Sequence, residues 1–243
     1  DDVEVRLVTI TNHSDARRRL RASSYGEVLL GSRAADQRHP AFNKLFVESD
    51  YVSDATALVF RRRPRASTEP ALFLAHSLTL GPDALTHITH GACESDRVRF
   101  LGRGRDARSP AALSDPAGLS GSTGPLLDPV MALSQDIVLE PSGHVQLAWV
   151  TSSASTRDDV LALAVKFQNW REIEATFDAA RRKSEADMRA ARLSTADLNA
   201  MEQVLSALLY PSAALRAAPD VLGANTLDQS GLYAFGLSGD LPI

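Results

Sequence analysis

The residues of this chain with the most evident chemical potential are two closely spaced histidines and the one cysteine. His87, His90 and Cys93 follow one another at intervals of three in the stretch HITHGAC. Imidazole and thiolate groups are zinc ligands, and a zinc site needs about four of them preorganised around the ion. This stretch is too strand-like to gather ligands three residues apart, and no second cysteine or histidine pair completes a set. We therefore expect ordinary strand or loop residues here and no metal site.

Glycine-rich segments that contain serine are the next candidates, because serine can act as a nucleophile. GLSGS (118–122) and GLSGD (236–240) both approach the Gly-x-Ser-x-Gly elbow of hydrolases. That elbow needs its last glycine and a position between a strand and a helix, and neither segment has both. LGRGRD (101–106) likewise lacks the third glycine and the frame of a dinucleotide-binding loop. These motifs supply no catalytic residue.

Two arginine clusters, RRRLR (17–21) and RRRPR (61–65), raise the question of nucleic-acid binding. The whole chain has 26 basic and 30 acidic residues, a formal net charge of −4, which offers no general attraction to a phosphate backbone. Only three of the basic residues are lysine, an arginine bias typical of a GC-rich bacterial genome. We interpret both clusters as solvated parts of strands, the second ended by Pro64, and expect no nucleic-acid partner.

The stretch HPAFNKLF (39–46) mixes polar and apolar groups in a way that suits a sugar. His39, Asn43 and Lys44 offer hydrogen-bonding groups for hydroxyls, and Phe42 and Phe46 offer apolar surface for the C–H faces of a pyranose ring. The same composition fits a plain loop anchored by two phenylalanines. Both interpretations stay open, since loops often carry function but need not.

Bulk composition is that of an ordinary globular protein. The 243 residues suffice for one large domain or two smaller ones, with 44% hydrophobic but only 6% aromatic residues. The single cysteine, Cys93, cannot form an internal disulfide, which favours a reducing compartment and leads us to predict a cytoplasmic location. No apolar run approaches the ~20 residues that span a bilayer, so we expect no membrane contact by this segment.

The first two-thirds of the chain predicts an antiparallel β-sandwich. Val3, Val5 and Leu7 alternate with Glu4 and Arg6, the period of two expected of a half-buried strand. Many short runs of this kind joined by turns are typical of a sandwich. The further runs are ARRRLRASSYGEVLL (16–30), KLFVESDYV (44–52), ATALVF (55–60), ALFLAHSLTL (71–80), VMALSQDIVL (130–139) and HVQLAWVT (144–151).

Turn signals separate these runs. TNHSD (11–15) and EPSG (140–143) are short, and in the second Pro141 presets φ while Gly143 accepts a positive φ. The segment 106–129 carries four prolines and three glycines and predicts a long surface loop, a feature that is often functional.

After Thr151 the hydrophobic period changes from two to 3.6, which predicts helices. Ser155 or Thr156 caps the first, with Val160, Ala164 and Phe167 on one face. The second carries an apolar stripe, and the third is capped by Ser194 or Thr195 and ends at Pro211. The predicted inward residues are Trp170, Ile173, Phe177, Ala180, Ser184, Met188 and Ala191 in the second helix and Leu198, Met201, Leu205 and Leu208 in the third.

Several stretches, taken together and in order along nearly the whole chain, resemble glycoside hydrolase family 94, the inverting glycoside phosphorylases. The resemblance is strongest to the phosphorylase-like C-terminal region of the cyclic β-1,2-glucan synthases. The stretches are HPAFNKLFVESDYV (39–52), RRRPR (61–65), VRFLGRGR (98–105), LSGSTGPLLDPVMAL (119–133), SALLYP (206–211) and LDQSGLYAFGLSGDLPI (227–243).

The resemblance implies a fold and a domain order. Family members have an N-terminal antiparallel β-supersandwich, a helical linker, an (α/α)6 barrel and a small C-terminal β domain. This chain would hold a β-supersandwich (1–152), a helical linker (153–218) and the lead-in to a missing barrel (219–243). Ser238, Gly239 and Asp240 would lie where the barrel begins, although Asp240 suits a helix N-cap or turn equally well. The abrupt apolar ending, Leu-Pro-Ile, would then continue into buried structure, so we expect a partial chain.

The resemblance also implies an activity for the complete enzyme. The family cleaves a β-glucosidic bond with inorganic phosphate as co-substrate, using one carboxylic acid to protonate the leaving oxygen while phosphate attacks the opposite face. No metal or organic cofactor is implied. The general acid is an aspartate of the barrel, and nothing in this chain matches its motif, so we assign no catalytic residue and expect the chain alone to be inactive.

What the resemblance leaves to this chain is a supporting role. It implies a homodimer that the sandwich helps to form and a loop that borders the active site of the partner. The partners it implies are β-glucan or β-glucooligosaccharide and the rest of the chain's own polypeptide, in which other regions would attach the full-length protein to the inner membrane. The candidate border residues are His39, Asn43, Lys44, Ser120, Gly121, Ser122, Thr123 and Gly124.

Two other functions remain open from the sequence. A stand-alone carbohydrate-binding module would display exposed aromatic platforms, and the chain has only two tryptophans. A purely structural dimerisation segment would need no binding residues at all.

Overall fold

The computed structural model describes residues 2–66, 69–82 and 89–209. Two compact units divide the chain, Asp1–Phe177 and Asp178–Ile243, and each is described by itself. The predicted boundaries at 152 and 218 stay predictions. The segment 219–243, with Ser238, Gly239 and Asp240, lies outside the described residues.

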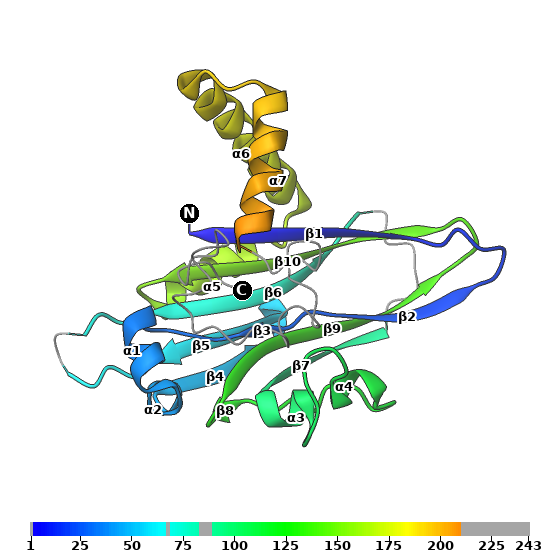
Figure 1. The fold of residues 1–243 in the computed structure, drawn as a ribbon. Coiled ribbons are helices and arrows are strands. Elements are labelled where there is room, and N and C mark those ends of the chain that lie inside the picture. Colours follow the sequence, from blue (N-terminus) through cyan, green and yellow to red (C-terminus); the bar gives the residue numbers. More distant parts are fainter. Residues whose placement is uncertain (1, 67–68, 83–88, 210–243) are drawn as a thin grey trace, which may run out of the picture. The chain divides into compact units, whose positions relative to one another are not determined.

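The first unit is built on two antiparallel sheets, drawn as two layers in Figure 1. The first sheet has the order β1-β10-β6-β5-β4-β8: β1 (Val3–Thr11), β10 (His144–Ala154), β6 (Phe73–Leu80), β5 (Ala57–Arg62), β4 (Val47–Val52) and β8 (Gly124–Pro125). The second has the order β2-β9-β3, with β7 also pairing with β9: β2 (Arg18–Ser23), β9 (Pro129–Leu139), β3 (Gly26–Glu27) and β7 (Thr89–Asp96). The predicted β architecture is therefore confirmed.

The chain passes from one sheet to the other in two adjacent turns, one between β1 and β2 and one between β9 and β10. Asn12 joins these turns: its buried side-chain Nδ2 donates to the carbonyl oxygens of Leu139 (3.3 Å) and Glu140 (3.0 Å). The predicted turn at 140–143 is present, but the positive φ (58°) falls on Ser142. Gly143 is needed for space, because a Cβ there would lie 3.0 Å from the carbonyl oxygen of Glu140.

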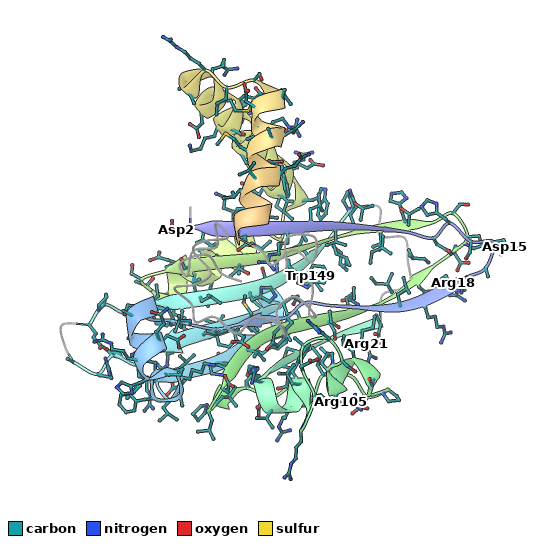
Figure 2. All side chains as sticks on the ribbon, in the orientation of Figure 1. Asp2, Asp15, Arg18, Arg21, Arg105 and Trp149 are labelled. Carbon is teal, nitrogen blue, oxygen red and sulfur yellow. The ribbon has the colours of Figure 1, made fainter. Side chains whose placement is uncertain are left out.

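The main core lies between the two sheets, because both turn alternate apolar side chains inward. Leu147 and Trp149 of β10 face Leu133 and Ile137 of β9 within one buried cluster, and Trp149, labelled in Figure 2, is 8% exposed. The odd-numbered residues of both strands supply this core, as the period of two requires.

Helices cover the outer faces of both sheets, so strands such as β10 are buried on both sides. Ala148 and Val150 of β10 pack outward against Phe167 and Ile173, next to α5 (Arg157–Lys166) and at the start of α6 (Trp170–Ala191). Thr156 caps α5 by accepting from the backbone N–H of Asp159 (3.1 Å). The predicted inward face of this helix is confirmed, because Val160, Ala164 and Phe167 are all buried.

The predicted surface loop 106–129 is only partly a loop. With α3 (Arg97–Leu101) before it, the segment forms α4 (Ala111–Ser114) and then β8. Phe100 and Leu119 are buried against Val130 on the outer face of β9, where Figure 1 shows α3 and α4. The remaining short helices of this unit are α1 (Arg33–Arg38), α2 (Pro40–Lys44) and the 3-10 turn η1 (Ser53–Ala55).

The second unit contains the rest of α6 and α7 (Thr195–Leu209). Ser194 caps α7 as predicted: its Oγ accepts from the N–H of Asp197 (3.2 Å), whose carboxylate accepts from the N–H of Ser194 (2.8 Å). The prediction that Met201 and Leu205 face inward was wrong, because each is 54% exposed. The hydrophobic period identifies the apolar face of a helix, but that face is buried only where another surface of the protein packs against it, and the period does not predict such a surface.

Within the described parts of the chain, no helix combines the length and the apolar character needed to cross a membrane.

Candidate functional site

The predicted border residues 39–44 form a helical corner between α1 and α2. Ser32 caps α1, and Pro40 begins α2, where its missing N–H costs no hydrogen bond. Asn43 holds the corner together: its buried Nδ2 donates to the carbonyl oxygens of Ala35 (2.7 Å) and His39 (2.9 Å). Asn43 is therefore engaged in structure and is not a free group for a ligand.

An aromatic and cationic cluster lies on the outside of this corner. Phe42 and Phe46 meet edge to face, 5.2 Å between ring centroids. The guanidinium of Arg65 lies over both rings, at 5.8 Å from Phe42 and 5.6 Å from Phe46, and that of Arg62 lies 5.7 Å from Phe46. Phe42 remains 49% exposed, so the corner presents an aromatic edge beside fixed cations.

A hollow of about 200 Å³ opens at the same place. Its lining residues are Ala35, Arg38, His39, Phe42, Asn43 and Arg65. Arg38 and Arg65 were not among the predicted site residues. The signal that could have found Arg65 was the RRRPR cluster, which we had interpreted as a solvated strand end.

Lys44 is paired with a carboxylate inside the fold. Its Nζ lies 2.6 Å from a carboxylate oxygen of Asp128, and only 18% of its side chain is exposed. Arg97 contacts the other oxygen of Asp128 at 3.4 Å. This ion pair fastens the end of α2 to the chain just before β9.

The predicted border segment 120–124 is held by a buried carboxylate. Glu94, 1% exposed, accepts from the backbone N–H groups of Ser95 (3.0 Å) and Asp96 (2.9 Å) with one oxygen. Its other oxygen accepts from the Oγ (2.5 Å) and the N–H (3.3 Å) of Ser120. The carboxyl group of Glu94 thereby shapes the start of the segment.

The rest of this segment is fixed by backbone contacts. The carbonyl oxygen of Ser122 accepts from the Oγ of Ser95 (2.6 Å), and the N–H of Gly124 donates to the Oγ of Ser49 (3.1 Å). Gly121 and Gly124 have φ values of 76° and 114°, which favour glycine. Of the predicted border residues here, Ser120, Gly121 and Thr123 are exposed.

Strand β4 brings the two predicted segments together, although they lie about 80 residues apart in sequence. It begins three residues after Lys44 and pairs with β8 through Glu48–Pro125 and Ser49–Gly124. The structure thus places both segments along one strand of the first sheet. The predicted border residues that are exposed are His39, Ser120, Gly121 and Thr123.

Residues 1–170 match the family described as "Glycosyl hydrolase 94, supersandwich domain". The chain belongs to this family. Its two stacked antiparallel sheets are the supersandwich that the resemblance implied, so the recognition and the fold class are confirmed.

A curated relative of this glycosyl hydrolase 94 chain extends the match to its full length. The chain is 28% identical over 242 residues to the cyclic beta-(1,2)-glucan synthase NdvB of Rhizobium meliloti (strain 1021). The match covers 100% of this chain and 8% of the relative. The chain thus spans less than a tenth of the protein to which it is similar.

Of the stretch HITHGAC (87–93), for which we expected no metal site, the structure describes the side chain of Cys93. Cys93 is buried in β7, and burial, with the charge of Glu94, raises the pKa of its thiol to about 11. The group is therefore a protonated thiol at neutral pH. Among the described residues no group of three or more His, Cys, Asp and Glu side chains could hold a metal ion, and His87 lies outside them.

One buried histidine of this supersandwich was missed by the sequence analysis. His76 on β6 contacts the Oγ of Ser24 through Nε2 (2.8 Å) and the Oγ1 of Thr151 through Nδ1 (2.9 Å). Burial is the main cause that lowers its pKa to about 4, and the charge of Arg6 adds to it. Its position inside the apolar run ALFLAHSLTL was the available signal. The neutral ring links the second sheet to the first.

Proposed function

We propose that this chain is the non-catalytic N-terminal part of the phosphorylase-like portion of a cyclic β-1,2-glucan synthase. The observation that carries the proposal is the match along the whole chain to a protein named for that synthesis. The supersandwich match to a glycoside-cleaving family supports it independently. The reaction of the complete enzyme would be phosphorolysis of a β-glucosidic bond with inversion, using inorganic phosphate as co-substrate and no organic cofactor.

The role that we propose for the chain is to support the active site and the dimer. The exposed corner at Phe42 and His39 has the character of an interface, because aromatic and arginine side chains are enriched in the cores of protein interfaces. The buried anchors Lys44 and Glu94 would keep the corner and the 120–124 segment in fixed positions beside it. A glucan bordering these segments, a homodimer and a cytoplasmic location belong to the same proposal.

The test compares two polypeptides, the 243-residue chain and the same chain extended through the region that follows it in its gene. We expect release of glucose 1-phosphate from β-1,2-glucan and phosphate by the longer polypeptide only. Turnover by the short chain would overturn the non-catalytic role. Absence of phosphate-dependent turnover by the longer one, on β-1,2-glucan and on other β-glucans, would overturn the proposed reaction.

A residue-level test asks whether the corner borders the active site. In the longer polypeptide we expect His39→Ala to raise the KM for glucan, while His13→Ala, at an exposed position in the β1–β2 turn, leaves it unchanged. Equal kinetics of both variants would remove the corner from the site and leave only the structural role. Measuring the dimer by light scattering in the same samples separates an effect on assembly from an effect on substrate.

A further inference from the structure

The hollow at the α1–α2 corner is lined by nitrogen donors of three side chains. Arg38 and His39 come from the junction of the two helices, and Arg65 comes from the segment after β5. Arg65 is 26 or more positions from Arg38 and His39 in sequence, so the fold assembles the cluster. Guanidinium groups bind phosphate in a forked geometry, and an imidazole N–H donates in either protonation state.

The surroundings of the hollow are positively charged although the chain carries a net charge of −4. Of the four arginines in the segment 61–65, Arg62 and Arg65 lie over the ring of Phe46 at the corner. The other two, Arg61 and Arg63, pair with the carboxylate of Glu48. The nearby Glu69 carboxyl responds to them: a hydrogen bond from the Arg65 backbone N–H, with the charges of Arg65 and Arg62, lowers its pKa. The guanidinium groups of Arg65 and Arg62 would also attract an anion entering the hollow, beside the Glu69 carboxylate that pairs with Arg65 (3.2 Å).

The two arginines are held in place and still have donors to offer. Arg65 lies over the rings of Phe42 and Phe46 and donates through Nε to Glu69 (3.2 Å). Arg38 donates through Nε to the carbonyl oxygen of Ala34 (3.1 Å). Each guanidinium has five N–H donors. The described contacts use the Nε–H of Arg38. On Arg65 they use the Nε–H and one terminal nitrogen, both against Glu69. A bound oxyanion would therefore find the remaining N–H donors on guanidinium groups that are already held in place.

Size and apolar surface limit the ligand. At about 200 Å³ the hollow is smaller than the ~300–1,000 Å³ pockets that enclose drug-sized molecules, so it suits one monosaccharide unit and no oligosaccharide. Phe42, half exposed at its wall, offers a ring on which the C–H face of a pyranose can lie.

We infer that this hollow binds a hexose phosphate, with the phosphate on Arg38, His39 and Arg65 and the sugar ring against Phe42. The inference goes beyond the proposed function, in which phosphate is a co-substrate of the complete enzyme and this chain has a supporting role. It needs no catalytic activity, because binding is a property of the described residues themselves.

The experiment is calorimetric titration of the 243-residue chain at low ionic strength and pH 7.5 with glucose 1-phosphate, inorganic phosphate and glucose. We expect glucose 1-phosphate to bind with a dissociation constant of about 1 mM or tighter, at least about tenfold tighter than either of the other two. Arg38→Gln and Arg65→Gln should each weaken it about tenfold or more, since a hydrogen bond to a charged group is lost. The matched control is Arg18→Gln, at the start of β2 and away from α1 and α2 (Figures 1 and 2).

Separate outcomes test the two halves of the ligand. Phe42→Ala should reduce the preference for glucose 1-phosphate over inorganic phosphate while inorganic phosphate binds as before. Equal binding of the two by the unmodified chain would overturn the sugar contact. The site would be overturned if neither glucose 1-phosphate nor inorganic phosphate bound detectably. It would also be overturned if both glutamine variants bound them as tightly as the unmodified chain. If circular dichroism shows that a variant is unfolded, the test uses the amide chemical shifts of residues 38, 39 and 65 in the unmodified chain during the same titration. If glucose 1-phosphate does not change these shifts, the site is also overturned.

Discussion

The buried His76 makes a quantitative prediction about stability and pH. In the folded chain its pKa is about 4, because burial removes the ring from water. In the unfolded chain it would have the ordinary value of about 6.5. As the pH falls below 6.5, the unfolded state therefore takes up a proton that the folded state refuses, and the folded state loses stability relative to it.

The size of the effect follows from these two values. The contribution of His76 to stability is complete above pH 6.5, falls as the pH is lowered and stops changing near pH 4. At about 1.4 kcal/mol for each pH unit, the interval corresponds to about 3 kcal/mol. The Ser24 and Thr151 hydroxyls bond to the ring in its neutral form, with one ring nitrogen donating and the other accepting.

The assay is urea unfolding of the 243-residue chain followed by tryptophan fluorescence between pH 4 and 7.5. Trp149 and Trp170 both belong to the unit Asp1–Phe177, so the signal reports on the unit that contains His76. His76→Gln keeps hydrogen-bonding groups but does not titrate. We expect the free energy by which the unmodified chain exceeds this variant to shrink by about 3 kcal/mol from pH 7.5 to pH 4.

Comparing the two chains at each pH cancels the titration of carboxyl groups that they share. His13→Gln replaces an exposed histidine in the same way and serves as the control. If the difference between the unmodified chain and His76→Gln stays constant within about 0.5 kcal/mol across this range, the reasoning from burial is refuted.

Three further predictions concern buried anchors and one strained residue. Glu94→Gln should lower the free energy of unfolding by about 2 kcal/mol, because an amide cannot accept all four hydrogen bonds of the carboxylate. The readout is faster amide hydrogen exchange at residues 120–124, and an unchanged exchange rate there would contradict the prediction. Asn12→Ala should cost about 2 kcal/mol in urea unfolding, because two carbonyl oxygens at the sheet junction lose a donor; a cost no greater than that of His13→Ala would count against the anchor. Arg192→Gly should raise the melting temperature of α6 and α7 by relieving a φ of 56°, worth about 1 kcal/mol, whereas Arg192→Ala should not, and equal effects of the two would exclude backbone strain.

Local patterns predicted the β-then-α order of the chain and several of its boundaries. The alternation at Val3 to Leu7 corresponds to β1, and the cap predicted at Ser155 or Thr156 is Thr156. These features succeed because strand alternation and helix capping involve only residues within a few positions of one another. The family resemblance rested on the same linear stretches, and the match to residues 1–170 confirms it.

The candidate site was only partly predictable, because its members depend on distant contacts. The segment HPAFNKLF does contribute to the hollow at the α1–α2 corner. Asn43 and Lys44, however, face inward because they bond to Arg62 and Asp128 respectively. Arg65 joined the corner only because β5 returns beside α2. The segment 120–124 depends on Glu94, to which no local motif pointed.

The sequence by itself determined the family, the layers of β structure and the caps of the later helices, because each is set by neighbouring residues along the chain. Only the tertiary structure decided which polar groups form hydrogen bonds or ion pairs inside the fold and which stay exposed. Burial and long-range pairing settle that choice: the Lys44–Asp128 contact joins residues 84 positions apart, and the contact between His76 and Ser24 joins two sheets. The residue type determines which chemistry a side chain can perform, but the neighbours that the fold places beside it determine whether it is free to contact a ligand.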